Sequence, residues 1–139
     1  MLEIQKDIEG QDYFKLIEYA MKHCNRFAFV ERKDEMDDVK VRMAYVNELV
    51  EDIQDSLIEI KEQSSWETNG LVDSMAYVFY YELNEKTKQF LQEKCQSLLS
   101  WISPYLPEDL MLYQDDSIWL ACNAHEGYFY CQDDLLEYE

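Results

Sequence analysis

Residues 75–83 read Met75-Ala76-Tyr77-Val78-Phe79-Tyr80-Tyr81-Glu82-Leu83 and carry the strongest β-strand pattern in the chain. Tyr, Val and Phe are enriched in β-strands because their bulky side chains pack well on a pleated surface. Successive side chains of a strand point to opposite faces, and both faces of this stretch are largely apolar. A strand that is apolar on both faces is typical of the interior of a sheet. The pattern therefore predicts a central strand over residues 75–83.

Two elements are expected at the start of the chain. Apolar residues recur at helical spacing over residues 12–24, which predicts an amphipathic helix. Its expected buried stripe consists of Phe14, Ile17, Met21 and Cys24, widened by Tyr13, Leu16 and Ala20. The run Phe27-Ala28-Phe29-Val30 that follows predicts a short strand, because it is apolar on both faces and ends at charged residues.

A second helix is expected to start near Asp34, where acidic side chains favour the positive end of the helix dipole. Its apolar stripe is Val39, Met43, Val46, Val50 and Ile53. Periodicity alone would allow this helix to continue to Lys61. The alternative is a break at residues 54–56 and a strand over 57–62. The break is favoured, because so long a helix would need a partner helix along its whole length.

The remaining chain predicts one more helix and several strands. Asn84 is a good N-cap for a third helix, whose apolar stripe continues to Ile102 before Pro104. Residues 64–70 look like a loop. Short strands are expected at 110–113, 118–122 and 128–131, separated by turns. The chain is therefore expected to form one α+β domain over residues 1–139. We expect a mainly antiparallel sheet of about five or six strands with about three helices on one side.

The composition is strongly acidic. There are 12 Lys and Arg against 30 Asp and Glu, for a net charge of −18, and Lys94 is the last Lys or Arg. Such a charge repels nucleic acids and anionic membranes and attracts basic proteins. Solubility alone explains any single carboxylate. The one-sided charge of the C-terminal segment nevertheless favours a basic protein partner, with no direct nucleic-acid binding and no membrane association.

The cysteine pattern indicates a reducing compartment. Cys24, Cys95, Cys122 and Cys131 form no C-x-x-C pair, and each lies in an apolar or amphipathic stretch. The first residues contain no signal-peptide core. We therefore expect reduced core thiols in a cytoplasmic protein.

The C-terminal segment mixes aromatic and acidic side chains in a way that is typical of an interaction surface. Tyr and Trp offer large rigid contact areas with a polar tip, and carboxylates around them would orient a basic partner. The alternative is that the aromatics fill the core and the acids coat the surface. The residues predicted to bind a partner are Asp115, Asp116, Trp119, Glu126, Tyr128, Tyr130, Asp133 and Asp134.

No cofactor or metal ion is expected from the sequence. The three glycines are isolated, so no phosphate-binding loop is present. Two histidines, His23 and His125, among many carboxylates are not a metal signature. The pair His125-Glu126 is the most enzyme-like feature, since a carboxylate could orient a histidine base. A solvated turn explains the pair more simply, because no nucleophile stands at a motif spacing.

Three parts of the chain resemble small acidic bacterial proteins of the toxin-immunity type. They are the runs Ser65-Trp66-Glu67, Leu106-Pro107-Glu108-Asp109-Leu110, and Ile118-Trp119-Leu120 with Ala124-His125-Glu126. The resemblance implies binding and neutralising of a cognate protein, and it carries no catalytic residues to this chain.

The leading hypothesis is therefore a non-enzymatic inhibitor, similar to an immunity protein or antitoxin, that neutralises a basic partner such as a nuclease. One alternative is a small enzyme or ligand-binding domain with an aromatic pocket near His125 and Glu126. Another is a structural or regulatory subunit with a merely solubilising surface. The sequence does not specify the identity of the partner or the oligomeric state.

Overall fold

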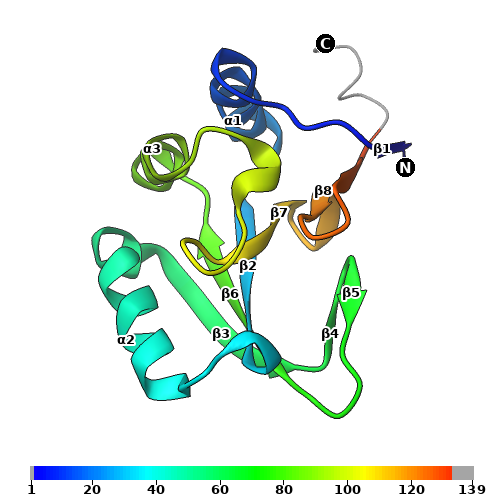
Figure 1. Cartoon of the computed structure of the whole chain (residues 1–139). Helices are drawn as coiled ribbons and strands as arrows, with labels where there is room; N and C mark the ends of the chain where they lie inside the picture. The colour runs from blue at the N-terminus through cyan, green and yellow to red at the C-terminus, as the bar shows by residue number, and fades with distance from the viewer. Residues whose placement is uncertain (1, 133–139) are drawn as a thin grey trace.

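A computed structural model describes residues 2–132 of the chain. Within this range, the main sheet contains seven antiparallel strands in the order β1-β9-β8-β7-β2-β6-β3 (Figure 1). The strands are β1 (Leu2–Ile4), β2 (Arg26–Arg32), β3 (Leu57–Gln63), β6 (Ala76–Glu82), β7 (Glu108–Gln114), β8 (Ser117–Asn123) and β9 (Tyr128–Cys131). The α+β class and the mainly antiparallel sheet are confirmed, with slightly more strands than expected.

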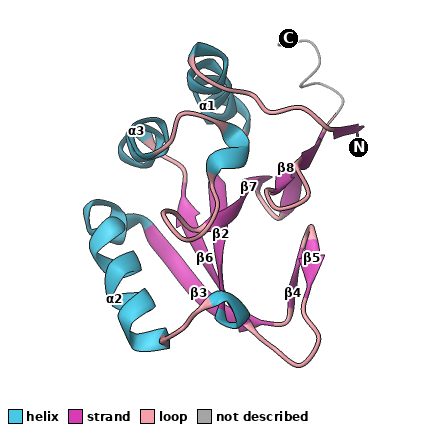
Figure 2. Ribbon diagram, in the orientation of Figure 1, coloured by secondary structure: helices cyan, strands magenta, loops and turns pink. Residues whose placement is uncertain are grey.

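In the described part of the chain, three α-helices accompany the sheet: α1 (Gln11–His23), α2 (Val39–Leu49) and α3 (Glu85–Lys94). Their buried apolar side chains belong to the larger of two apolar clusters among the described residues, on one face of the sheet. The smaller cluster, on the opposite face, contains no helical residue among those described. Figure 2 shows this separation, with the helices on one side and strands β4 and β5 on the other. The helices therefore pack on one side, as predicted.

The strand predicted over residues 75–83 forms β6, which has a neighbouring strand on each side. It pairs with β2, where Phe79 lies opposite Phe29 and Tyr81 opposite Phe27. The rings of Phe27 and Tyr81 stack with centroids 5.2 Å apart. Both apolar faces of β6 are used, because Phe79 and Tyr81 belong to the helix-side cluster and Val78 to the opposite cluster.

Helix α1 buries much of the expected stripe, with Phe14 as the exception. Tyr13, Leu16, Ile17 and Ala20 are buried, whereas Phe14 is 43% exposed. The Tyr13 hydroxyl donates to the carbonyl of Leu91 at 2.5 Å and thereby ties α1 to α3. The helix is oriented by this contact with α3 as well as by the sheet, and sequence periodicity does not contain that information.

The break after the second helix is confirmed. Asp38, four residues later than the expected start, caps α2 by accepting a hydrogen bond from the Val41 N–H at 3.2 Å. A 3₁₀ turn, η2 (Glu51–Ser56), follows the helix, and β3 begins at Leu57. A second 3₁₀ turn, η1 (Lys33–Glu35), precedes the helix.

Helix α3 begins as predicted but ends early. The Asn84 side chain accepts from the Thr87 N–H, and the Thr87 hydroxyl accepts from the Asn84 N–H, which completes a capping box. The helix stops at Lys94 because the next residues pair with the segment before α1. Gly10 donates to the carbonyl of Gln96, and Leu98 donates to that of Ile8. The predicted helical stripe to Ile102 is therefore wrong.

Strand β1 and a short hairpin are not predicted by the sequence pattern. Strand β1 pairs with β9 at the edge of the sheet. The expected loop at 64–70 contains a two-stranded hairpin, β4 (Ser65–Trp66) and β5 (Asn69–Gly70). Trp66 is 9% exposed and packs in the smaller apolar cluster. The hairpin thus covers part of the sheet face that the helices leave open, which we call the helix-free face.

Candidate functional site

The predicted acidic pair Asp115 and Asp116 forms the turn between β7 and β8. Asp115 has a positive φ of 54° and is held by Asn25, with hydrogen bonds of 2.9 Å in both directions. Asp115 therefore has a structural role in the turn. Asp116 is different, because its side chain is 95% exposed and lies 3.6 Å from the guanidinium of Arg26.

A small hollow lies beside this turn on the helix-free face. It measures about 160 Å³ and is lined by both turn aspartates together with Tyr80 and Tyr113. The two tyrosine rings lie 6.2 Å apart. Lys61 also lines the hollow, and its ammonium lies 5.5 Å from the centre of the Tyr80 ring. Here the structure brings aromatic and acidic side chains together, as expected for Asp115 and Asp116, although Tyr80 and Tyr113 were not among the predicted partner-binding residues.

Tyr128 and Tyr130 lie on the same helix-free face, on strand β9. Their neighbour Phe129 is buried in the helix-side cluster, so the two tyrosines point the other way. Both are partly exposed, and their rings meet edge to face at 5.3 Å. Tyr130 pairs with Ala121 on one side and with Glu3 on the other. These two predicted residues are available to a partner.

The prediction that Trp119 binds a partner is wrong, because this side chain is fully buried on the helix side of the sheet. Its ring is parallel to that of His23, with centroids 6.1 Å apart, and 5.9 Å from that of Tyr19. The pairing of β7 with β8 shifts register between Leu112 and Tyr113. Simple alternation along β8 therefore does not predict which face Trp119 occupies, and this side chain contributes to the core instead of a partner surface.

Glu126, another predicted carboxylate, lies far from the Asp115–Asp116 turn. Glu126 is exposed in the turn between β8 and β9, where its N–H donates to the Asn123 side chain at 3.2 Å. That turn and the Asp115–Asp116 turn lie at opposite ends of β8, roughly 20 Å apart at the usual rise per residue. Asp133 and Asp134 lie outside the described residues.

A second group of candidate functional side chains was not predicted as a unit. Glu35 from η1, Glu108 from the start of β7 and His125 from the β8–β9 turn meet at one end of the sheet. The Nε2 atom of His125 lies 3.1 Å from Oε2 of Glu35 and 3.3 Å from Oε2 of Glu108. We call these three residues the Glu–Glu–His cluster. The sequence instead suggests a pairing of His125 with its neighbour Glu126.

Glu108 is the buried member of the cluster, with 1% of its surface exposed. Neither carboxylate oxygen has a well-oriented hydrogen-bond donor among the described residues. Burial, reinforced by the nearby Glu35 and Asp109 carboxyl groups, raises the pKa of Glu108 far above its usual range. Arg32 opposes this shift only weakly, because its Nη1 atom lies 3.9 Å from Glu108.

Asp109 holds the surroundings of the cluster in place. It is fully buried and has a positive φ of 59°, which a non-glycine residue rarely adopts. One carboxylate oxygen accepts the Ala124 N–H at 2.9 Å, and the other accepts the Trp66 indole N–H at 2.9 Å. Asp109 therefore links the hairpin to the turn that carries His125. Burial raises its pKa.

A signal for this cluster was present in the sequence but is easy to miss. Glu108 and Asp109 stand directly before the apolar run Leu110-Met111-Leu112, in a position where a strand enters the core. Adjacent carboxylates at such a boundary are expected to be partly buried. Their meeting with Glu35 and His125 depends on the order of strands, which the sequence does not reveal.

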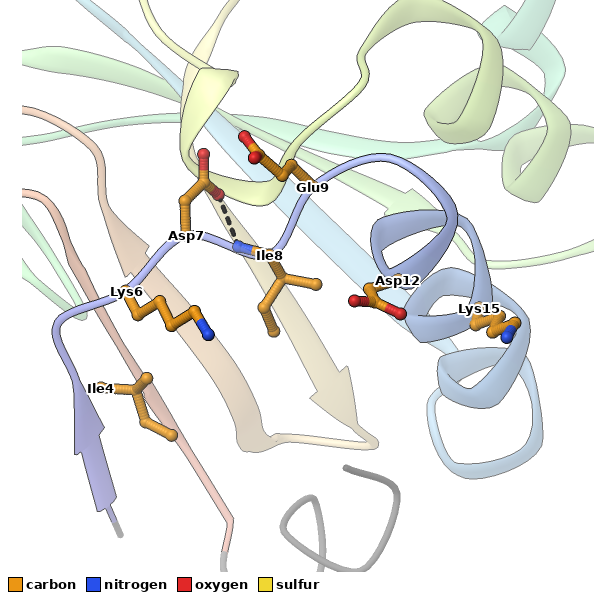
Figure 3. Close-up of a pocket in the computed structure, with 7 residues that line it drawn as sticks. All are labelled: Ile4, Lys6, Asp7, Ile8, Glu9, Asp12 and Lys15. Carbon is orange, nitrogen blue, oxygen red and sulfur yellow. Dashed lines mark hydrogen bonds between the residues drawn. The ribbon is translucent and has the colours of Figure 1, made fainter.

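A larger hollow lies elsewhere, between β1 and α1, and measures about 680 Å³ (Figure 3). Its charged side chains, including Lys6, Asp12 and Lys15, are spread along the rim and do not converge on one point. Asp7 is occupied with structural hydrogen bonds to the N–H groups of Ile8 and Leu99. The described residues of this hollow form no arrangement of groups that could perform chemistry.

Comparisons with protein-family models, curated proteins and solved structures found no match to this chain. Among the described residues, no helix has the length and apolar character needed to cross a membrane.

Proposed function

We propose that this protein is an inhibitor of the immunity or antitoxin type that binds a basic protein through the helix-free face of its sheet. The observation that carries the proposal is the placement of four partly exposed tyrosines on that face. They are Tyr80, Tyr113, Tyr128 and Tyr130.

Tyrosines in this arrangement suit an interface for a physical reason. Each provides a large apolar ring with a hydroxyl at its tip, and such residues are frequent among those that dominate binding energy. The rings are already paired, at 5.3 Å for Tyr128 with Tyr130 and 6.2 Å for Tyr80 with Tyr113. Side chains that are ordered before binding lose less conformational entropy when a partner arrives.

The charge of the chain supports a basic partner. The net charge is −18, and Asp116 and Glu3 are exposed beside the two tyrosine pairs. Exposed carboxylates at the rim of an interface mainly raise the association rate, because they attract the partner from a distance. A nuclease that grips phosphates with a basic cleft has the complementary charge.

The test uses tagged protein as bait in an extract of the source organism. The wild type is compared with Tyr128→Ser/Tyr130→Ser, and Tyr105→Ser is the matched control, since Tyr105 is 79% exposed and outside the surface. We expect the wild type and the control to retain the same basic protein, and the double variant to lose it. Retention by the wild type should fall as the salt concentration rises.

Circular dichroism establishes first that all three proteins are folded. The proposal is wrong if the double variant retains the partner as well as the control does. It is also wrong if the partners retained by the wild type are acidic, or if no protein depends on the tyrosines for retention.

A further inference from the structure

The Glu–Glu–His cluster has the ligands of a metal site, and they come from three separate parts of the chain. A shared site made from η1, β7 and the β8–β9 turn requires the folded chain, because the three segments are far apart in sequence. The ligand atoms of Glu35, Glu108 and His125 all lie within 4.8 Å of one another.

The distances fit a single ion. Zn²⁺ binds carboxylate oxygen and imidazole nitrogen at about 2.0–2.2 Å, so two ligands of one ion are expected roughly 3.0–3.5 Å apart. His125 Nε2 lies 3.1 Å from Glu35 and 3.3 Å from Glu108. An ion can therefore be accommodated with only small side-chain movements.

The second, independent observation is Glu108 itself. Its side chain is 99% buried within the fold and points at the cluster, and its oxygens lack well-oriented hydrogen-bond donors. A buried carboxylate without such donors is costly, unless a proton or a cation neutralises it. A metal ion in the cluster would supply that neutralisation.

We propose that Glu35, Glu108 and His125 bind one Zn²⁺-type divalent transition-metal ion, with the remaining coordination positions open to solvent. Mixed oxygen and nitrogen ligands suit such an ion, whereas Ca²⁺ takes six to eight oxygen ligands. The partly exposed His125 and Glu35, at 37% and 28% of their side-chain surface, leave room for water or a ligand on the open side.

The surroundings support the three ligands. Asp109 binds the Ala124 N–H and so fixes the turn that carries His125. Arg32 is the nearby cation, but two hydrogen bonds of 3.0 and 2.8 Å engage its guanidinium with Asp34. The guanidinium also lies 3.4 Å from Glu35 and 3.9 Å from Glu108, so an ion at the cluster would share these two carboxylates with an arginine whose charge Asp34 partly offsets.

The experiment is isothermal titration of EDTA-treated, dialysed full-length protein with Zn²⁺. The chain contains two histidines, so His23→Gln is a natural control for His125→Gln. Glu126→Gln, an exposed carboxylate in the same turn, is the control for Glu108→Gln. Glu108→Gln has the shape of the protonated acid, and circular dichroism checks that each variant is folded.

We expect one equivalent of Zn²⁺ to bind the wild type and both controls. The affinity should fall by about tenfold or more in His125→Gln and in Glu108→Gln. In ¹⁵N NMR spectra of the wild type, the imidazole of His125 should shift on Zn²⁺ addition, while that of His23 should not. Equal binding by all variants, a shift of both histidines, or no saturable binding would overturn the proposal. None of these outcomes depends on the four tyrosines of the helix-free face.

Discussion

The indole N–H of Trp66 donates to the buried carboxylate of Asp109 at 2.9 Å, and this bond joins the β4–β5 hairpin to the main sheet. The other oxygen of Asp109 accepts the Ala124 N–H in the turn beside His125. Asp109 is fully buried, so each of these donors compensates for the removal of its carboxylate from water. A change in the hairpin is therefore expected to alter the turn that carries His125 of the Glu–Glu–His cluster.

We expect Trp66→Phe to destabilise the protein by about 1–3 kcal/mol, because it leaves a buried carboxylate oxygen without its donor. The phenyl ring retains much of the apolar contact, so the lost hydrogen bond accounts for most of the effect. Urea unfolding measures the change, with Tyr105→Phe as an exposed aromatic control. If Trp66→Phe is as stable as the control, the hydrogen bond does not contribute to stability.

The stability of the metal-free protein should depend on pH through Glu108. Its pKa is raised in the folded state above the usual 4.5 by burial and by the Glu35 and Asp109 carboxyl groups. At pH values between the usual pKa of 4.5 and the raised pKa of the folded state, the folded protein holds a proton that the unfolded chain releases. The free energy of unfolding therefore falls as pH rises through this range. The stabilisation is complete below about pH 4.5 and is lost as pH rises toward the folded-state pKa.

Glu108→Gln removes this titration while preserving the shape of the side chain. We expect its free energy of unfolding, minus that of the wild type, to increase from about pH 5 to pH 9 in the presence of EDTA. Urea unfolding at several pH values measures the difference. Parallel pH profiles for the two proteins would show that Glu108 has an ordinary pKa in the folded state.

The parts of the fold that the sequence predicts are those with strong periodicity. Helix α1 and strands β2 and β6 through β9 lie close to their expected positions, because each buries a face long enough to leave a pattern. Strand β1 and the β4–β5 hairpin contain two or three residues per strand, too few for a period to be recognised. The end of α3 depends on the Gly10–Gln96 hydrogen bond, which is a tertiary contact.

The residues of the candidate sites were predictable only in part. Alternation along β9 indicates that Tyr128 and Tyr130 share a face, but the shift in register between β7 and β8 determines the position of Trp119. Glu35, Glu108 and His125 lie in three segments that carry no shared motif. Their meeting follows from the placement of β7 between β8 and β2.

The ion pair between Glu31 and Arg42 is expected to be important for stability. Glu31 is 3% exposed, and both its oxygens accept from Arg42, at 2.6 and 3.0 Å. Arg42→Met would leave the Glu31 carboxylate buried without its cation and should cost about 3 kcal/mol. Adding Glu31→Gln should restore much of that loss, since it removes the unpaired charge. Thermal unfolding of both variants tests this, and additive losses in the double variant would contradict it.

Two cysteines provide a test of the packing of the sheet. Cys122 is fully buried and Cys95 is 5% exposed, and burial raises the pKa of both thiols. Because the thiolate is the reactive form, we expect neither to react with iodoacetamide at pH 7.5 while the protein is folded. Peptide mass spectrometry after timed labelling measures the reaction at each position. Labelling should begin at the urea concentration where the far-ultraviolet circular dichroism signal is lost, because unfolding exposes both thiols. Rapid labelling of Cys122 without urea would mean that β8 opens locally, and that the turn with His125 is not held as firmly as the Asp109 contact implies.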